Sequence, residues 1–367
     1  MNNRTGYVFH ELCMWHDTGN DGFYMPYGYP VQPYMHAENP ETKRRMHNLI
    51  VASGMVDQLV EIKARAAQDQ ELLRFHTQEY LNSFKEQSQA GGGDYGGAPF
   101  GHGSYEIAKL STGGVLEAVD AVIEGRVDNA YALVRPPGHH ALADKGMGFC
   151  FFANAVLAGL HAMEKHGLER VAYIDWDVHH GNGTQSAFWH RSDALTISLH
   201  QDNCFPIDSG HISEVGEGEG EGYNINIPLP PGSGSGAYYQ AFDEVVIPAL
   251  QKFKPDMIFV ACGFDAGAND PLGRMLLHSE AYRTLTQKAM ALADELCDGR
   301  LLMCHEGGYN AVTVPFYGLA VVEQLAGHRT DVVDPFCDHV MAMAGHDLKP
   351  QEDVVIQAAK ALIKNIK

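Results

Sequence analysis

Short apolar segments alternate with longer segments of helical periodicity along most of this chain. Apolar runs rich in β-branched and aromatic residues indicate buried strands, and strands separated by helices indicate a parallel sheet covered on both faces. We therefore predict an α/β fold, a single domain over 1–367 with a central, mostly parallel sheet flanked by helices. The predicted strands are 7–9, 130–134, 171–175, 195–199, 223–227, 257–261 and 301–304. The predicted helices lie near 104–124, 151–165, 183–189, 237–253, 280–296, 312–325 and 352–365.

Turn-forming residues gather directly after several of these strands. Clusters of Gly and Pro occur at 136–138, 181–183 and 307–308, and they place sharp loops at strand ends. Because open parallel sheets carry their functional sites at the carboxyl ends of strands, we expect the active site in these loops. Two long segments without periodicity, 15–40 and 89–103, are predicted to be loops, and the first to be functional or packed against a partner.

The composition restricts the cellular compartment and the kinds of binding partner that we expect. The chain has 46 acidic and 26 basic residues, a net charge of −20, which argues against direct nucleic-acid binding and is compatible with cationic substrates. Its seven Cys are widely spaced and form no CxxC motif, which is typical of reduced thiols. The sequence begins without a secretory signal pattern and contains no apolar run of membrane-spanning length. We therefore expect a cytoplasmic protein that does not bind membranes.

The strand predicted at 171–175 runs into polar residues at alternate positions. Side chains at i and i+2 of an extended segment share a face, so Asp175, Asp177 and His179 point one way. Two carboxylates and an imidazole crowded at a strand end are costly unless a positive charge lies between them. The alternative is a polar strand end that bonds loop amides.

A third carboxylate, Asp265, follows the strand predicted at 257–261. Together with Asp177 and His179 it forms a set that suits a divalent metal of the zinc type, with positions left open for water and substrate. Capping of a helix is the alternative role for Asp265.

Two adjacent histidines, His139 and His140, follow a rigid Pro-Pro-Gly turn and suit proton transfer at neutral pH. Asp175 is a candidate partner for one ring and Asn182 for the other. A carboxylate raises the pKa of a histidine more than an amide does, so one ring would act electrostatically and the other as a base. Tyr309 follows paired glycines, and its hydroxyl either stabilises an oxyanion beside the metal or fills the core.

These motifs, in this order, resemble those of histone deacetylases. The chain is similar to class II-type, bacterial histone deacetylase-like amidohydrolases of the arginase/deacetylase superfamily. The resemblance spans about residues 130 to 310, and the segments PETKRR (40–45) and GSYEIAKLSTGG (103–114) are compatible with it. The matching segments are PPGHH (136–140), GFCFFAN (148–154), DWDVHHGNGTQ (175–185), SLHQDNCFP (198–206), GFDA (263–266) and EGGY (306–309).

The resemblance implies a role for each matching residue. It implies that one Zn²⁺ per chain is bound by Asp177, His179 and Asp265. His140 would be the general base and later the acid, and His139 would be its electrostatic partner, bonded to Asp175. Asn182 stands where some relatives carry an aspartate, and Tyr309 matches the residue that polarises the acyl carbonyl.

The same resemblance implies substrate and potassium sites. Phe149 and Phe205 would wall a narrow channel for the lysine side chain, the carbonyl of Gly148 would accept the substrate amide hydrogen, and Asp94 would grip the peptide backbone at the rim. One structural potassium ion would be held by Asp175, Asp177, His179, Ser198 and Leu199. A second would be held by Phe188, Arg191, Ala194 and Tyr223.

The function implied is zinc-dependent hydrolysis of the acetyl or acyl amide of N-ε-acyl-lysine in proteins or peptides, which releases acetate. An acetylpolyamine amidohydrolase, which acts on small acetylated amines, is the alternative within the same chemistry. A catalytically weak acyl-lysine-binding module is a third, which Tyr309 disfavours. We also expect a homo-oligomer, either a dimer or a tetramer.

Overall fold

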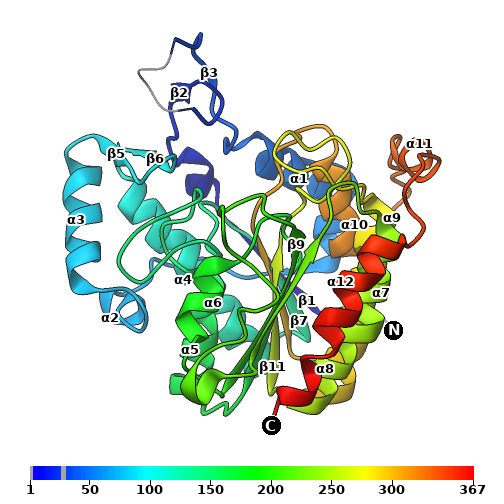
Figure 1. Cartoon of the computed structure of the whole chain (residues 1–367). Coiled ribbons are helices and arrows are strands. Elements are labelled where there is room, and N and C mark those ends of the chain that lie inside the picture. The colour runs from blue at the N-terminus through cyan, green and yellow to red at the C-terminus, as the bar shows by residue number, and fades with distance from the viewer. Residues whose placement is uncertain (1–2, 26–29) are drawn as a thin grey trace.

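The computed structural model describes residues 3–25 and 30–367, and a sheet of eight strands lies at its centre (Figure 1). The strand order is β10-β9-β8-β11-β12-β7-β1-β4, and every neighbouring pair is parallel. The α/β prediction is confirmed, and the central sheet is wholly parallel. Its strands are β1 (Thr5–Phe9), β4 (Leu59–Glu61), β7 (Asn129–Leu133), β8 (Val171–Asp175), β9 (Ala194–Gln201), β10 (Asn224–Leu229), β11 (Met257–Cys262) and β12 (Leu301–His305).

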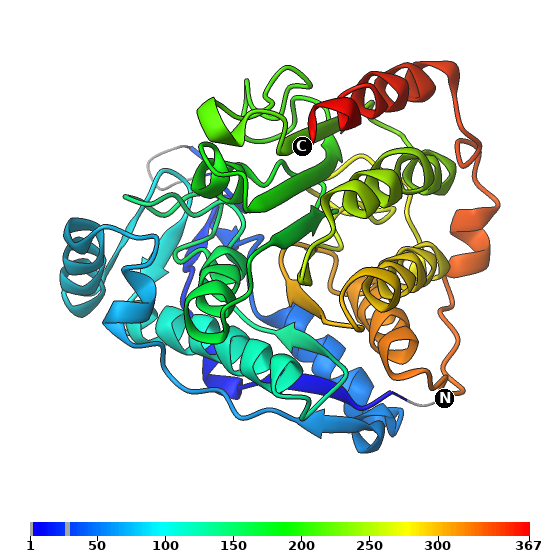
Figure 2. The same cartoon turned by 90° about the horizontal axis from the view of Figure 1, so that it is seen from below.

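Helices cover both faces of the sheet, as Figure 2 shows from below. Within β8, Val171 and Tyr173 join the core beneath α4 and α5, whereas Ala172 and Ile174 join the core beneath α7 to α10. Burial on both sides explains why the central strands are nearly continuous apolar runs. The helices are α1 (Glu41–Ala52), α2 (Asp69–Leu72), α3 (Gln78–Gln89), α4 (Ser104–Ile123), α5 (Asn154–His166), α6 (Asn182–Phe188), α7 (Ser235–Ala241), α8 (Ile247–Phe253), α9 (Ser279–Leu296), α10 (Val314–Ala326), α11 (Cys337–Met341) and α12 (Pro350–Lys360).

Several elements differ from the sequence predictions. The helix predicted at 237–253 is divided into α7 and α8 by a π-helical turn, Phe242–Val246. The edge strand β4 and the helices α1 and α3 were not predicted. Among the helices of the described ranges, none combines the length and apolarity that crossing a bilayer requires.

Both predicted loops contain regular structure. Segment 15–40 includes a pair of two-residue strands, β2 (Asn20–Asp21) and β3 (Tyr34–Met35), which projects beyond the sheet in Figure 1, and residues 26–29 lie outside the described ranges. Segment 89–103 contains an antiparallel hairpin of β5 (Gly92–Asp94) and β6 (Pro99–Gly101). Short strands with glycine-rich sequences lack the alternating pattern by which longer strands are predicted.

Candidate active site

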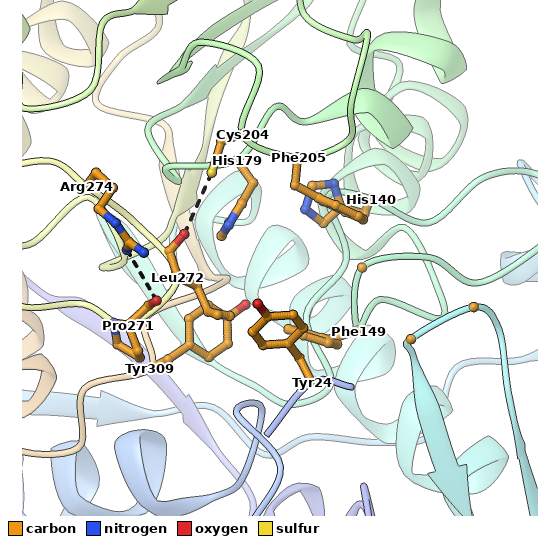
Figure 3. Close-up of a pocket in the computed structure, with 13 residues that line it drawn as sticks. Tyr24, His140, Phe149, His179, Cys204, Phe205, Pro271, Leu272, Arg274 and Tyr309 are labelled. Atoms are coloured by element: carbon orange, nitrogen blue, oxygen red, sulfur yellow. Dashed lines mark hydrogen bonds between the residues drawn. The ribbon is translucent and has the colours of Figure 1, made fainter. Parts of the chain in front are cut away.

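A pocket with a volume of about 330 Å³ opens at the carboxyl ends of the central strands (Figure 3). Its floor is buried, since His140 and His179 are 3% and 7% exposed, whereas Pro271 and Arg274 are exposed at its rim. The functional loops therefore lie where the parallel topology predicts them. The described residues that line the pocket are Tyr24, Gly96, Gly97, His140, Gly148, Phe149, His179, Cys204, Phe205, Pro271, Leu272, Arg274 and Tyr309.

Two half-buried phenylalanines form walls of this pocket. The Phe205 ring lies 5.0 Å from the His140 ring in an edge-on contact, and the Phe149 ring lies 5.8 Å from the Tyr309 ring. Gly148 also lines the pocket. Of the four predicted substrate-binding residues, these three meet in one cavity.

Asp177, His179 and Asp265 converge at the pocket floor. The Nδ1 atom of His179 lies 3.0 Å from Oδ1 of Asp177 and 3.1 Å from Oδ2 of Asp265. The remaining carboxylate oxygens accept backbone hydrogen bonds, one from Gly307 to Asp177 and one from Val178 to Asp265, both at 2.8 Å. Both carboxylate oxygens of Asp265 are thus engaged at the pocket floor, and Asp265 is not the N-cap of a described helix.

This group fits a divalent metal ion. Each of its three residues offers a ligand atom within 4.8 Å of the others, and all three are buried. Burial and the neighbouring charge of Asp177 raise the pKa of Asp265 to about 6, which is the cost of placing two carboxylates together out of water. A bound cation removes that cost. The backbone also leaves space for the group, because a methyl at Gly307 would overlap carboxylate oxygens of Asp265 and Asp177.

Two other groups in the described part of the chain have metal-ligand composition but fit less well. Asp120, His161 and His166 meet between α4 and α5, where the Lys165 ammonium already lies 2.6 Å from the Asp120 carboxylate. His139, Cys150 and Glu306 form the second group, in which burial raises the pKa of the Cys150 thiol well above its ordinary value. A protonated thiol is a poor ligand.

The tandem histidines have different partners. Nδ1 of His139 lies 2.9 Å from a carboxylate oxygen of Asp175, and Nδ1 of His140 lies 2.7 Å from the amide oxygen of Asn182. Both contacts require the ring to donate from Nδ1, which leaves Nε2 of His140 free to accept a proton. The structure thus pairs the four residues as the sequence predicted.

Their surroundings separate the pKa values of the two rings. Burial lowers the pKa of His139, but the negative charges of Asp177 and Asp175 outweigh it and raise that pKa to about 10. Burial and the charges of His139 and His179 hold the pKa of His140 well below its ordinary value. These opposite directions favour the neutral form of His140 and the charged form of His139.

Tyr309 follows β12 and points into the pocket (Figure 3). Its backbone N–H donates to Asp270 at 2.7 Å, and a second oxygen of Asp270 accepts from Leu272 at 2.9 Å. The buried Asp270 therefore ties the tyrosine loop to the rim segment that contains Leu272. Sequence reasoning missed Asp270, because a lone acid in a loop has no pattern that identifies it.

Glu306 was quoted in a motif but assigned no role. Its Oε2 accepts from the backbone N–H groups of Gly138 and His139, at 2.7 and 3.1 Å, and the side chain is fully buried. Glu306 thereby holds the turn that presents the histidines. Its position two residues after the strand predicted at 301–304 was the signal that could have identified it.

Asp94 lies outside the lining of the pocket. Its exposed side chain accepts from Gly97, whose turn borders the rim, so the β5–β6 hairpin places the carboxylate near the entrance. In the first potassium group, Asp175 at the carboxyl end of β8 pairs in register with Ser198 in the middle of β9. The second group, Phe188, Arg191, Ala194 and Tyr223, surrounds the amino end of β9, where the Tyr223 carbonyl accepts from Thr196 at 3.0 Å.

Comparison with known proteins identifies what this arrangement resembles. Residues 36–325 match the histone deacetylase domain. The chain is 52% identical over 344 residues to a histone deacetylase-like amidohydrolase of Pseudomonas aeruginosa, covering 93% of this chain and 90% of the relative. It is 34% identical to a probable deacetylase of Archaeoglobus fulgidus, over 88% of this chain and 86% of that protein.

Eukaryotic proteins are also similar. Histone deacetylase HDA1 of Saccharomyces cerevisiae is 34% identical over 83% of this chain, which corresponds to 46% of the yeast protein. The crystal structure of the HDA15 HD domain superposes with a TM-score of 0.81 at 32% identity, covering 99% of this chain and 95% of that one.

Proposed function

This chain belongs to the histone deacetylase family of hydrolases, and we propose that it hydrolyses the acetyl or acyl amide of N-ε-acyl-lysine side chains with one Zn²⁺ per chain. The observation that carries the proposal is one pocket whose floor brings Asp177, His179 and Asp265 together beside His140, the ring oriented by Asn182. Zinc held by those three ligands would supply Lewis acidity to the acyl oxygen and to the attacking water.

The residues around the ligands would carry the protons and the charge. His140, free at Nε2, takes a proton from the attacking water and later gives it to the departing amine. The Tyr309 hydroxyl, whose pKa is raised well above its ordinary value by burial, stays protonated and donates a hydrogen bond to the developing oxyanion. His139, paired with Asp175, contributes positive charge beside them.

The pocket favours an acyl-lysine over an acetylpolyamine. Phe149 and Phe205 provide apolar walls for a neutral alkyl stem, and Gly148 lines the same pocket. Among the described lining residues none is acidic, whereas Arg274 adds a positive charge at the rim. The second ammonium of a polyamine would find no carboxylate in that lining.

We also propose roles for the pocket rim, the potassium sites and the chain as a whole. Asp94 grips the peptide backbone, the two residue groups around β9 hold structural potassium, and residues 1–367 act as one catalytic domain in a cytoplasmic homo-oligomer. Oxygen donors such as the Ser198 hydroxyl and the Tyr223 carbonyl support the potassium sites.

A substrate comparison tests the main proposal. Metal-replete enzyme is assayed on an acetyl-lysine peptide and on acetylputrescine, before and after chelation and after zinc is restored. We expect peptide turnover that disappears on chelation and returns with zinc. Cleavage of acetylputrescine alone would overturn the assignment to acyl-lysine, and turnover that survives complete metal removal would overturn the zinc assignment.

A further inference from the structure

We propose that Arg274 selects acyl-lysine substrates that carry an acidic residue beside the acylated lysine. The inference rests on the proposed function and adds a substrate class to it. Arg274 is the one cationic side chain of fixed charge among the described residues that line the pocket, and it is exposed at the rim.

The Arg274 guanidinium is not neutralised by a carboxylate. Its Nη1 donates to the carbonyl oxygens of Gly273 at 2.7 Å and Pro271 at 3.4 Å. Within residues 3–25 and 30–367, no ion pair to Arg274 is formed. This leaves guanidinium N–H groups of Arg274 for a partner carboxylate.

Asp270, a buried acid four positions before Arg274 in the chain, is already hydrogen-bonded to other groups. Both oxygens of Asp270 accept backbone hydrogen bonds, from Leu272 and Tyr309. Arg274 is itself held in place, because its backbone N–H donates to Oε1 of Gln201 at 2.8 Å. Arg274 thus has a fixed backbone and a guanidinium without a carboxylate partner. It is therefore suited to bind a negatively charged substrate group at the pocket entrance.

The position of Arg274 restricts where that substrate carboxylate lies. The catalytic groups are at the buried floor, whereas Arg274 is exposed beside Pro271 and Leu272 (Figure 3). The Arg274 guanidinium therefore does not reach the acyl group at the floor. It can reach a substrate residue that flanks the acylated lysine. Figure 3 shows Arg274 on one side of the pocket and the β5–β6 hairpin on the other. Because that hairpin carries the exposed Asp94, the acidic preference should hold on one flank only.

Matched peptides test the proposal. End-capped pentapeptides with a central acetyl-lysine carry Glu or Gln at the preceding or the following position, and kcat/KM is measured with metal-replete enzyme. Exposed pairs of opposite charge give roughly a two- to five-fold preference, so we expect that ratio for Glu over Gln on one flank at low salt. The ratio should shrink as ionic strength rises.

Variants of Arg274 test whether its guanidinium causes the Glu/Gln ratio in kcat/KM. Arg274→Gln should bring the Glu/Gln ratio to about one, Arg274→Glu should invert it, and Arg274→Lys should retain part of it. Arg126→Gln removes an equal charge from a residue that pairs with Glu124, just before the amino end of β7, and should preserve the wild-type ratio. Each ratio is internal to one enzyme, so a general loss of activity does not affect it.

The possible results separate the two proposals. Turnover of acetyl-lysine peptides with a Glu/Gln ratio of one on both flanks overturns the role of Arg274 and leaves the proposed function intact. A preference that survives in Arg274→Gln also overturns it. Failure of metal-replete enzyme to cleave any of the peptides removes both proposals.

Discussion

The Nδ1 atom of His140 lies 2.7 Å from the amide oxygen of Asn182, so a neutral group orients the ring that we propose as the base. The adjacent ring, His139, is oriented by a carboxylate. One chain segment, from Asp175 to Asn182, thus supplies a charged partner to one imidazole and a neutral partner to the other.

Replacing Asn182 by Ala should lower kcat by roughly ten- to a hundred-fold, because His140 loses the acceptor that fixes its tautomer and orientation. KM should change much less, since Asn182 is not among the residues that line the pocket. Steady-state kinetics on an acetyl-lysine peptide provides the measurement. Asn82→Ala, on the exposed face of α3, is the control, and equal activities in the two variants would contradict this role for Asn182.

Tyr309→Phe removes one hydroxyl and keeps the ring that packs against Phe149. Loss of an oxyanion donor costs about 10²- to 10³-fold in kcat, so deacetylation should fall by that amount while zinc content stays near one per chain. Metal analysis and kinetics on the same preparation make the measurement. The control Tyr239→Phe removes a hydroxyl from α7, and wild-type turnover in Tyr309→Phe would exclude the hydroxyl from the reaction.

Asp265→Asn should have opposite effects on metal binding and on the stability of the metal-free protein. The variant loses a ligand and should not retain zinc. It also removes one of two adjacent buried carboxylates, so its melting temperature in chelator should exceed that of chelated wild type. Added zinc should raise the melting temperature of wild type only. Asp57→Asn, an exposed control, should behave as wild type, and zinc stabilisation of Asp265→Asn would argue against ligation by this residue.

Asp120→Asn should destabilise the pairing of α4 with α5. The carboxylate, in a residue only 4% exposed, accepts from His161, His166 and Lys165 at 2.8, 2.7 and 2.6 Å. Burial raises the pKa of Asp120, but these contacts outweigh it and hold the pKa well below its ordinary value of 3.8. We expect a loss of about 2 kcal/mol in the free energy of unfolding at pH 7.

The pH dependence of that loss has a definite sign. Because the folded pKa of Asp120 is depressed, its stabilisation is fully present above the ordinary value of 3.8 and declines as pH falls below it. Urea unfolding at pH 7, 5 and 3.5 should show a difference between wild type and Asp120→Asn that is maintained to pH 5 and then narrows. The control Asp128→Asn breaks an exposed pair with Arg4 and should cost under about 1 kcal/mol. A difference that widened toward pH 3.5 would contradict the assigned sign.

Local patterns predicted most of the sheet and much of the site. β8 coincides with its predicted range because the buried run 171–174 ends in Asp175 and polar residues follow at alternate positions, Asp177 and His179. The edge strand β4 escaped prediction because its residues are half-buried or exposed and carry no apolar run. The hairpin of β5 and β6 escaped because glycine-rich strands have no periodicity.

Local sequence patterns do not predict contacts between segments that are far apart in the chain. The bond from Gly138 to Glu306 joins residues 168 positions apart. Asp270 acts on Tyr309 from 39 positions away, through a backbone amide that any residue type would supply. The order of the strands in the sheet decides which carboxylate accepts a hydrogen bond from which backbone amide. The pattern of a single strand does not predict the order β8-β11-β12-β7.

The hydrogen bond from Gly307 to Asp177 spans 130 positions of the chain. It positions a proposed zinc ligand, and Gly307 makes it from the loop after β12, which pairs with β11. A chain interrupted before this point, or one in which β12 is unpaired, has all three ligand side chains and still lacks the geometry that holds them. Retention of the metal would therefore report that β12 is paired with β11 in the folded sheet.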